Sequence, residues 1–257
     1  LPWQLERLCK ILFFLFIPED RREKMNEIFD GYIENNFGEQ KQCPVKKAQF
    51  HYNYKKFFPD VQQNPKCLDI GIGRGEMLSC LLEWGMTDVH GVDISPSVIH
   101  FCRSLNLPCE LVADTGKYLH DHKGEFDYVT LLDVLEHITP QETLNFLRLI
   151  QLALKPGGRI IIQVPNMQAV DSNVYYYGDF THCAGFTEHS LIQIFTTLKF
   201  SKYNIYPYEV FCYGGYKEFI AKMLRPFFHS FTRFRRKCIG AHCPEILTPV
   251  FFAVVER

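Results

Sequence analysis

The stretch Asp69-Ile70-Gly71-Ile72-Gly73-Arg74-Gly75-Glu76 decides the fold of this chain of 257 residues. It follows a short apolar run at residues 66–70 and precedes an amphipathic run at residues 77–84. Glycine lets the backbone turn sharply and approach a ligand with no Cβ in the way. The helix that follows offers free N–H groups at its start. A strand that runs through glycines into a helix therefore predicts a ligand-binding loop.

The residues around these glycines indicate which ligand the loop holds. A dinucleotide fingerprint that begins at Gly71 needs Gly or Ala at position 76, where this chain has Glu76. A pyrophosphate brings negative charge to the start of the helix. The acidic Asp69 suits a cationic ligand and not a phosphate. A dehydrogenase stays as an alternative that NADH binding would support.

Working outward from the loop, strand and helix patterns alternate. We expect a sheet that is mostly parallel, with helices on both faces. Ser95 is the expected N-cap of the helix at 96–104, and Pro226 is expected to kink or split the helix at 214–238. Strands are expected at 66–70, 89–92, 109–113, 126–132, 159–164, 203–210 and 249–255, and further helices at 77–84, 140–154 and 188–198, with a turn at 155–158.

Polar side chains stand at the ends of the first four predicted strands. Right-handed crossovers place these ends on one edge of the sheet. Asp93, at the end of the second strand, can accept the hydrogens of two ribose hydroxyls. Asp114 follows the third strand and can reach an adenine amino group. The segment Leu132-Asp133-Val134-Leu135-Glu136-His137 follows the fourth strand. Together these residues predict an adenosine site at this edge.

Residues 66–166 resemble the class I S-adenosylmethionine-dependent methyltransferases. The resemblance lies in the glycine loop 69–75, in Asp93 and Asp114, in the segment 133–137 and in the Leu-Lys-Pro-Gly-Gly turn at 154–158. It implies a Rossmann-like sheet of seven strands with the last strand antiparallel. It also implies S-adenosylmethionine as cofactor, S-adenosylhomocysteine as product, and methyl transfer as the reaction.

The resemblance and the strand ends together give the predicted site. His182 lies in a loop after the fifth strand and is expected to be a general base, as is His137, with Asp179 as an orienting carboxylate. Each histidine also has a structural reading: His182 as a loop-closing side chain, and His137 as a side chain packed against adenosine. The expected cofactor-binding residues are Asp69, Gly71, Gly73, Gly75, Asp93, Ile94, Asp114, Leu132, Asp133 and His137.

The chain divides into an N-terminal helical segment at 1–62, an accessory part or lid, and a methyltransferase domain at 63–257 with a helical insert at about 214–245. The apolar run Ile11–Ile17 is too short to cross a bilayer. We expect it to form a helix that packs on the domain, with a shallow membrane contact as the alternative.

Composition and charge narrow the partners. The formal net charge is −1, which gives no general reason to expect nucleic acid. The ten cysteines contain no C-x-x-C pair, so we expect a reduced protein in the cytoplasm. Cys212, Cys238, His242 and Cys243 do not have the spacing of a common zinc site, and we expect no metal.

Residues 217–237 combine apolar side chains at helical spacing with seven lysines and arginines, against the single acid Glu218. We expect a helix that caps the substrate pocket. The alternatives are a peripheral contact with an anionic membrane, which would place the enzyme at its inner face, and RNA binding.

We expect O-methylation of a sugar or another small hydroxylated acceptor, which can be lipid-linked. The insert resembles those of methyltransferases in bacterial surface-polysaccharide pathways. The alternatives are a quinone-precursor or phenol O-methyltransferase and a non-catalytic partner subunit that binds S-adenosylmethionine. No Asn-Pro-Pro-Tyr-type tetrapeptide follows the fourth strand, which disfavours methylation of base or glutamine amino groups. The sequence leaves the oligomeric state open.

Overall fold

A computed structural model describes residues 41–58, 64–210 and 215–257. The predictions for the run Ile11–Ile17 and for the rest of residues 1–40 lie outside the described residues. Within the described parts, no helix is long and apolar enough to span a membrane.

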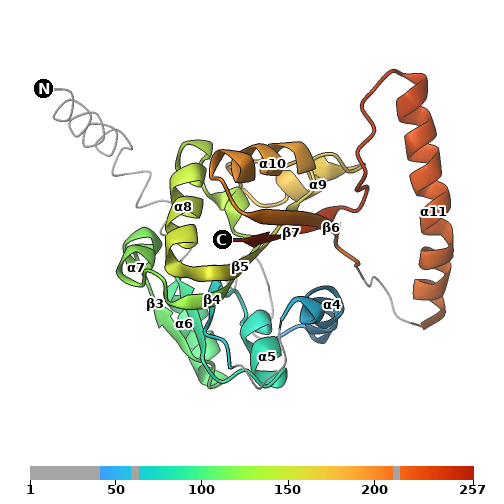
Figure 1. Ribbon diagram of the computed structural model, residues 1–257. Helices are drawn as coiled ribbons and strands as arrows, with labels where there is room; N and C mark the ends of the chain where they lie inside the picture. The colour runs from blue at the N-terminus through green and yellow to red at the C-terminus, as the bar shows by residue number, and fades with distance from the viewer. Residues whose placement is uncertain (1–40, 59–63, 211–214) are drawn as a thin grey trace, which may run out of the picture.

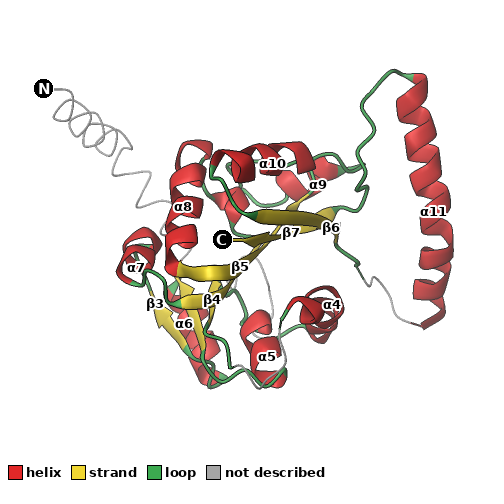
Figure 2. Cartoon of the chain, viewed as in Figure 1, coloured by secondary structure: helices red, strands yellow, loops and turns green. Residues whose placement is uncertain are grey.

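Seven strands of the described chain form one sheet in the order β3-β2-β1-β4-β5-β7-β6. The first five strands along the chain pair in parallel, and β7 lies antiparallel between β5 and β6 (Figure 2). This confirms the predicted fold class. The strands are β1 Cys67–Ile70, β2 Val89–Asp93, β3 Cys109–Leu111, β4 Phe126–Leu132, β5 Leu154–Pro165, β6 Lys202–Pro207 and β7 Val250–Glu256.

Helices cover both faces of the sheet, as near-continuous apolar runs in its central strands require. On one face α4, α5 and α6 enclose a core cluster, and on the other α7, α8 and α10 enclose a second (Figure 1). The helices on the first face are α4 Pro44–Tyr54, the 3-10 turn η1 Lys55–Phe57, α5 Glu76–Glu83 and α6 Pro96–Ser104. The others are α7 Thr115–Asp121, η3 Leu135–His137, α8 Pro140–Ala153, α9 Ser172–Tyr176, α10 Glu188–Thr197 and α11 Gly215–Cys238.

The helix starts follow from local sequence. The Ser95 hydroxyl accepts a hydrogen bond from the Val98 N–H and caps α6, which confirms the predicted N-cap. Asp114 caps α7 in the same way through the Lys117 N–H. The sequence reading missed α7, because a seven-residue helix is too short for a clear apolar period.

Two further expectations differ from the structure. The predicted turn at 155–158 lies inside β5: Phe126 pairs with Leu154 and Tyr128 already with Arg159, so four residues loop out of the register. Pro226 was expected to kink or split its helix; it does not split it, because α11 continues through this residue, and the kink stays a prediction. Proline removes one N–H donor from a helix, and the long runs on both sides of Pro226 supply the remaining backbone bonds.

The helix α4 is fixed to the sheet by one buried polar pair. The Tyr54 hydroxyl donates a hydrogen bond to Gln163 Oε1 on β5, and the Tyr54 ring meets the Phe252 ring edge-on at 5.0 Å. A buried polar group that has a partner specifies one position for the element that carries it. The N-terminal helix α4 therefore has a defined place beside the carboxyl edge of the sheet.

Replacing Phe251 tests the core. Phe251 on β7 is fully buried, so Phe251→Ala should lower the free energy of unfolding by about 3–5 kcal/mol in chemical denaturation. Phe234 on α11 is 65% exposed, so the control Phe234→Ala should change it by less than about 0.5 kcal/mol. Equal losses in the two variants would contradict the placement of α11 outside the core.

Candidate functional site

A cavity of about 1210 Å³ opens at the carboxyl edge of the sheet. It is lined by the ends of β1, β2 and β4 and by the segments that follow them, together with residues of α4, α8 and α9. It brings together every predicted site residue except Gly75: Asp69, Gly71, Gly73, Asp93, Ile94, Asp114, Leu132, Asp133, His137, Asp179 and His182.

The glycine turn needs its glycines for two different reasons. Gly71, Gly73 and Gly75 all have positive φ, a conformation that side chains disfavour. A Cβ on Gly71 would stand 2.4 Å from Val134 Cγ2, so this glycine lets the β1 and β4 ends approach each other beside the cavity. Gly75 is the N-cap of α5, and its Cβ would stand 2.3 Å from Leu107 Cδ1. Gly75 therefore shapes the turn from behind and does not line the cavity.

Asp69 places a buried carboxyl at the end of β1. Its side chain accepts a hydrogen bond from Thr130 Oγ1 at 2.5 Å. Burial raises the pKa of Asp69 to about 7, and the Thr130 hydrogen bond opposes this shift without cancelling it. A carboxyl in this environment gains most from a neighbouring cation, because a cation favours its ionised form.

Asp93 places a second carboxyl at the end of β2. Its Oδ1 accepts from the Ser95 N–H at 2.9 Å. Burial raises the pKa of Asp93 to about 6, against backbone hydrogen bonds from Ser95 and Gly73. Asp114 is more exposed. Its Oδ1 caps α7 by accepting a hydrogen bond from the backbone N–H of Lys117 at 2.8 Å.

Asp133 follows β4 in the left-handed conformation, with φ of 56°. Its Oδ1 accepts from Gln163 Nε2 at 2.7 Å, and its Oδ2 lies 3.8 Å from Lys46 Nζ. Because Gln163 also accepts from Tyr54, Asp133 belongs to a chain of contacts that runs from α4 through β5 to the cavity.

His182 is carried to the cavity by a loop that is hydrogen-bonded to the end of β4. The N–H groups of Cys183 and Ala184 both donate to the carbonyl oxygen of Glu136, at 2.8 and 3.0 Å. The segment after β5 is thereby held over the segment after β4. This explains how His182 meets Glu136 and His137 across 45 positions of sequence.

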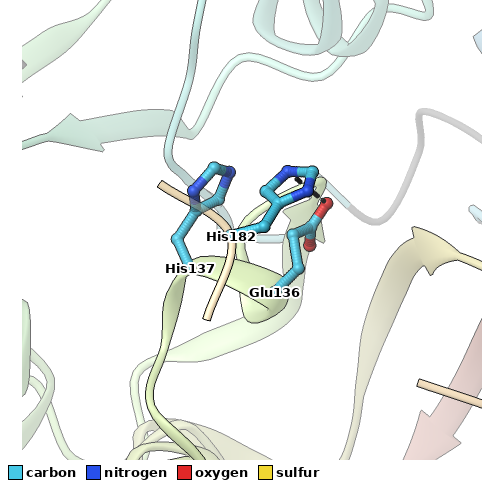
Figure 3. A group of neighbouring side chains, drawn as sticks. All are labelled: Glu136, His137 and His182. Atoms are coloured by element: carbon cyan, nitrogen blue, oxygen red, sulfur yellow. Dashed lines mark ion pairs between the residues drawn. The ribbon is translucent and has the colours of Figure 1, made fainter. Parts of the chain in front are cut away.

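The contacts of His182 define its tautomer. Its Nδ1 lies 3.0 Å from the carbonyl oxygen of Tyr176, a group that can only accept, so Nδ1 carries the proton. Its Nε2 then presents a lone pair, 4.0 Å from Glu136 Oε1 (Figure 3). Glu136 is buried, which raises its pKa well above the usual range, and its Oε2 has no hydrogen-bond partner among the described residues.

His137 is held by a short relay from Asp179. The Thr181 hydroxyl donates to Asp179 Oδ1 at 2.6 Å and so can only accept from His137 Nδ1 at 2.8 Å. Burial raises the pKa of Asp179, but the two hydrogen bonds from Thr181 outweigh it and lower the pKa overall. Burial and the nearby His182 lower the pKa of His137. Asp179 thus orients His137 through Thr181.

Glu136, His137 and His182 each offer one ligand atom, and these three atoms lie within 4.8 Å of one another (Figure 3). Imidazole nitrogens and a carboxylate oxygen are suitable ligands for a divalent cation. This is the group of described residues that could hold a metal. The prediction of no metal therefore stays a prediction.

Sequence reasoning missed the contribution of α4 to the cavity. Lys46 and Phe50 line it, with Lys46 Nζ 5.4 Å from the centre of the Phe50 ring. Only their helical spacing was visible in the sequence, and spacing does not show which neighbour a helix packs against. Glu136 belonged to the quoted segment, but no sequence feature marked it as the acid that faces His182.

The family model described as "Methyltransferase domain" matches residues 45–202. The chain belongs to this family. The match spans the glycine turn, the strand ends and both histidines. The chain is an S-adenosylmethionine-dependent methyltransferase of class I, as the sequence predicted.

Similar proteins agree with this assignment. The methyltransferase is 30% identical over 110 residues to a ubiquinone biosynthesis O-methyltransferase of Thiobacillus denitrificans, covering 40% of this chain and 46% of that one. It is 27% identical over 106 residues to a relative of the same description from Pseudomonas aeruginosa, covering 39% of this chain and 44% of that one. The methyltransferase thus matches less than half the length of these curated relatives.

Solved structures share the fold. A SAM-dependent methyltransferase from Archaeoglobus fulgidus superposes with a TM-score of 0.65 at 22% identity, covering 88% of this chain and 98% of that one. A 1,6-didemethyltoxoflavin-N1-methyltransferase of Burkholderia thailandensis with bound S-adenosylhomocysteine gives a TM-score of 0.56 at 17% identity, covering 93% and 90%.

The residues of the cavity suit S-adenosylmethionine, which is the cofactor of the family. It carries an ammonium, a sulfonium and a carboxylate, and two carboxyls, the buried Asp69 and the half-buried Asp93, stand beside the glycine turn. Lys46 is the one lysine or arginine among the described residues that line the cavity. A dinucleotide would bring two phosphates to this acidic edge with little positive charge to meet them.

Asp93→Ala tests the predicted contact of Asp93 with the ribose hydroxyls. Losing a buried hydrogen-bond partner should weaken S-adenosylmethionine binding by about 1–3 kcal/mol, measured by titration calorimetry. Asp88→Ala is the matched control, because Asp88 pairs with His90 on an exposed side of β2 away from the cavity. Unchanged affinity in Asp93→Ala would remove the ribose assignment.

The raised pKa of Asp69 predicts a pH dependence of cofactor affinity. Bound ammonium favours the carboxylate, whereas the free protein holds the carboxyl protonated below a pKa of about 7. Affinity should therefore fall as the pH is lowered, by roughly eightfold between about pH 7.5 and about pH 6. In Asp69→Asn the affinity for the cofactor should be lower than in wild type at both pH values, and the change in affinity between them should be less than about threefold. A wild-type affinity that is flat over this range would contradict the assignment.

Proposed function

We propose that this methyltransferase transfers a methyl group from S-adenosylmethionine to a hydroxyl group of a small acceptor, with His182 as the general base. The observation that carries the proposal is the state of the His182 ring. Its Nδ1 lies 3.0 Å from the Tyr176 carbonyl oxygen, which leaves Nε2, 4.0 Å from Glu136 Oε1, as the nitrogen that can accept a proton, and the residue lines the cavity.

In this proposal, different residues of the cavity bind different parts of the cofactor. The bound cofactor supplies an electrophilic methyl group. Asp69 would bind its ammonium, Asp93 its ribose hydroxyls and Asp114 its adenine amino group. Gly71 and Gly73 would leave room for the amino-acid part. These contacts fix the position of the donor, so that an acceptor held in the rest of the cavity is in line for transfer.

Proton removal falls to His182. A hydroxyl is a weak nucleophile, and loss of its proton to a nearby base speeds its attack. His182 Nε2 would take this proton and become charged. The Glu136 carboxyl, with Oε1 4.0 Å from His182 Nε2 and with Oε2 unpartnered among the described residues, would then stabilise the imidazolium by facing its positive charge.

His137 and Asp179 have a positioning role in this proposal. The Asp179–Thr181–His137 relay fixes one wall of the acceptor site, and the His137 ring meets the His182 ring at 4.7 Å with the two planes inclined at 66°. Because burial and His182 lower the pKa of His137, it stays neutral and does not compete for the proton.

Among acceptors, a phenol of the quinone-precursor type has the better support. The relatives named above are ubiquinone biosynthesis O-methyltransferases, and aromatic side chains of α4, α8 and α9 line the cavity: Phe50, Phe146 and Tyr175. A sugar or lipid-linked acceptor stays as the second candidate. A cytoplasmic enzyme at the inner face of a membrane would meet both kinds, and residues 217–237 are the segment on which such a location depends.

Replacing His182 tests the mechanism. With catechol as probe acceptor and methyl mannoside as the sugar probe, His182→Asn should lower kcat by about 10²–10⁴-fold, the scale of a lost general base. S-adenosylmethionine affinity should stay within about twofold of wild type, because His182 takes no part in the proposed cofactor contacts. The control His90→Asn changes an exposed histidine outside the cavity and should leave kcat unchanged.

Two results would contradict this mechanism. If a chelator abolished turnover and a divalent cation restored it, the imidazoles would be metal ligands and not bases. If the chain bound S-adenosylmethionine but no acceptor turned over in single-turnover assays, it would be a non-catalytic binding subunit.

A further inference from the structure

We infer that α11 docks this protein on the surface of an anionic lipid bilayer. Helix α11 is 24 residues long, and none of its residues is buried. It stands beside the domain, away from the sheet, and the chain after its C-terminal end leads back to β7 (Figure 1). At 1.5 Å per residue it presents a side about 36 Å long.

The helix is amphipathic in the opposite sense to an ordinary surface helix, which turns its apolar stripe to the core. Its apolar residues recur at helical spacing and are all between 47% and 72% exposed. Such a patch on the outside of a protein marks a contact with another molecule or a membrane. The outward stripe consists of Tyr216, Phe219, Ile220, Met223, Leu224, Phe227, Phe228, Phe231 and Phe234.

The polar side of α11 is the side that holds the domain. Arg225 Nη1 lies 2.5 Å from Glu209 Oε2. Arg233 donates to the Glu245 carbonyl at 3.0 Å, and Arg236 donates to the carbonyls of His242 and Gln168. These contacts fix the rotation of the helix, so the apolar stripe must face away from the domain.

The charged residues beside the stripe indicate which kind of surface it contacts. At 100° per residue, Lys217, Arg235 and Lys237 flank the stripe, whereas the single acid of the helix, Glu218, falls on the domain side. Apolar and aromatic residues bordered by lysine and arginine suit an interface of acyl chains and anionic headgroups. In a dimer formed through this stripe, these cations would lie close to the same cations of the second copy, and the stripe has no carboxylate to pair with them.

The attachment also places the pocket near the bilayer. Arg236 binds the carbonyl of Gln168, in the same segment that continues through α9 to His182. That segment exposes Val174, Tyr177 and Phe180 by 65%, 80% and 94%. A docked enzyme would draw its acceptor from the lipid phase, a consequence that rests on the proposed O-methyl transfer, whereas docking itself does not.

Vesicle sedimentation of the full chain tests the docking without donor or acceptor. The protein should pellet with vesicles of phosphatidylcholine and phosphatidylglycerol, and much less with phosphatidylcholine alone. Phe227→Ser with Phe231→Ser should weaken binding at least about tenfold, because two rings of the stripe are lost. Lys217→Gln with Arg235→Gln and Lys237→Gln should weaken it similarly and reduce the effect of added salt.

The matched control changes two exposed apolar residues elsewhere. Leu105→Ser with Ile192→Ser removes side chains that are 42% and 37% exposed, directly after α6 and on α10, and should bind vesicles like wild type. Wild-type binding by the Phe227→Ser, Phe231→Ser variant would overturn the inference. So would a dimer in solution that this variant dissociates, because a second copy would then cover the stripe. Failure of methyl transfer would leave the vesicle result unaffected.

Discussion

Everything in the site depends on the parallel pairing of β1 with β2 on one side and β4 on the other. Gly71 allows the ends of β1 and β4 to approach, since a methyl group there would collide with Val134. Parallel strands carry their carboxyl ends to one edge of the sheet. Asp69 and Asp93, near the ends of β1 and β2, and Asp133, directly after β4, therefore line one cavity.

A second level of order comes from the loop after β5. Two N–H groups share the Glu136 carbonyl, and they carry His182 to the acid and the histidine that follow β4. The result is a cluster of one acid, Glu136, and two bases, His137 and His182. Burial raises the pKa of Glu136 and lowers that of His137, so the two move toward neutrality. Burial thus disfavours a net charge on either group.

The sequence was sufficient where local pattern decides structure. The strands, the glycine turn, the capped helix α6 and the acids at strand ends were all predictable, because each depends on residues next to one another. It was insufficient where distant segments meet. Neither the contact of Lys46 with Asp133 nor the relay from Asp179 through Thr181 to His137 leaves a trace in spacing. The helix α7 and the register shift in β5 were missed because they are short.

The way α11 is attached has a consequence for how this chain can change over evolutionary time. Arg233 and Arg236 bind backbone carbonyl oxygens of Glu245, His242 and Gln168, and every amino acid supplies that oxygen. After substitutions at these three positions, the two arginines would still have their hydrogen-bond acceptors. Apart from Glu209, whose carboxylate pairs with Arg225, the attachment therefore makes few demands on the side chains beneath the insert, which could diverge while the catalytic edge stays constrained residue by residue.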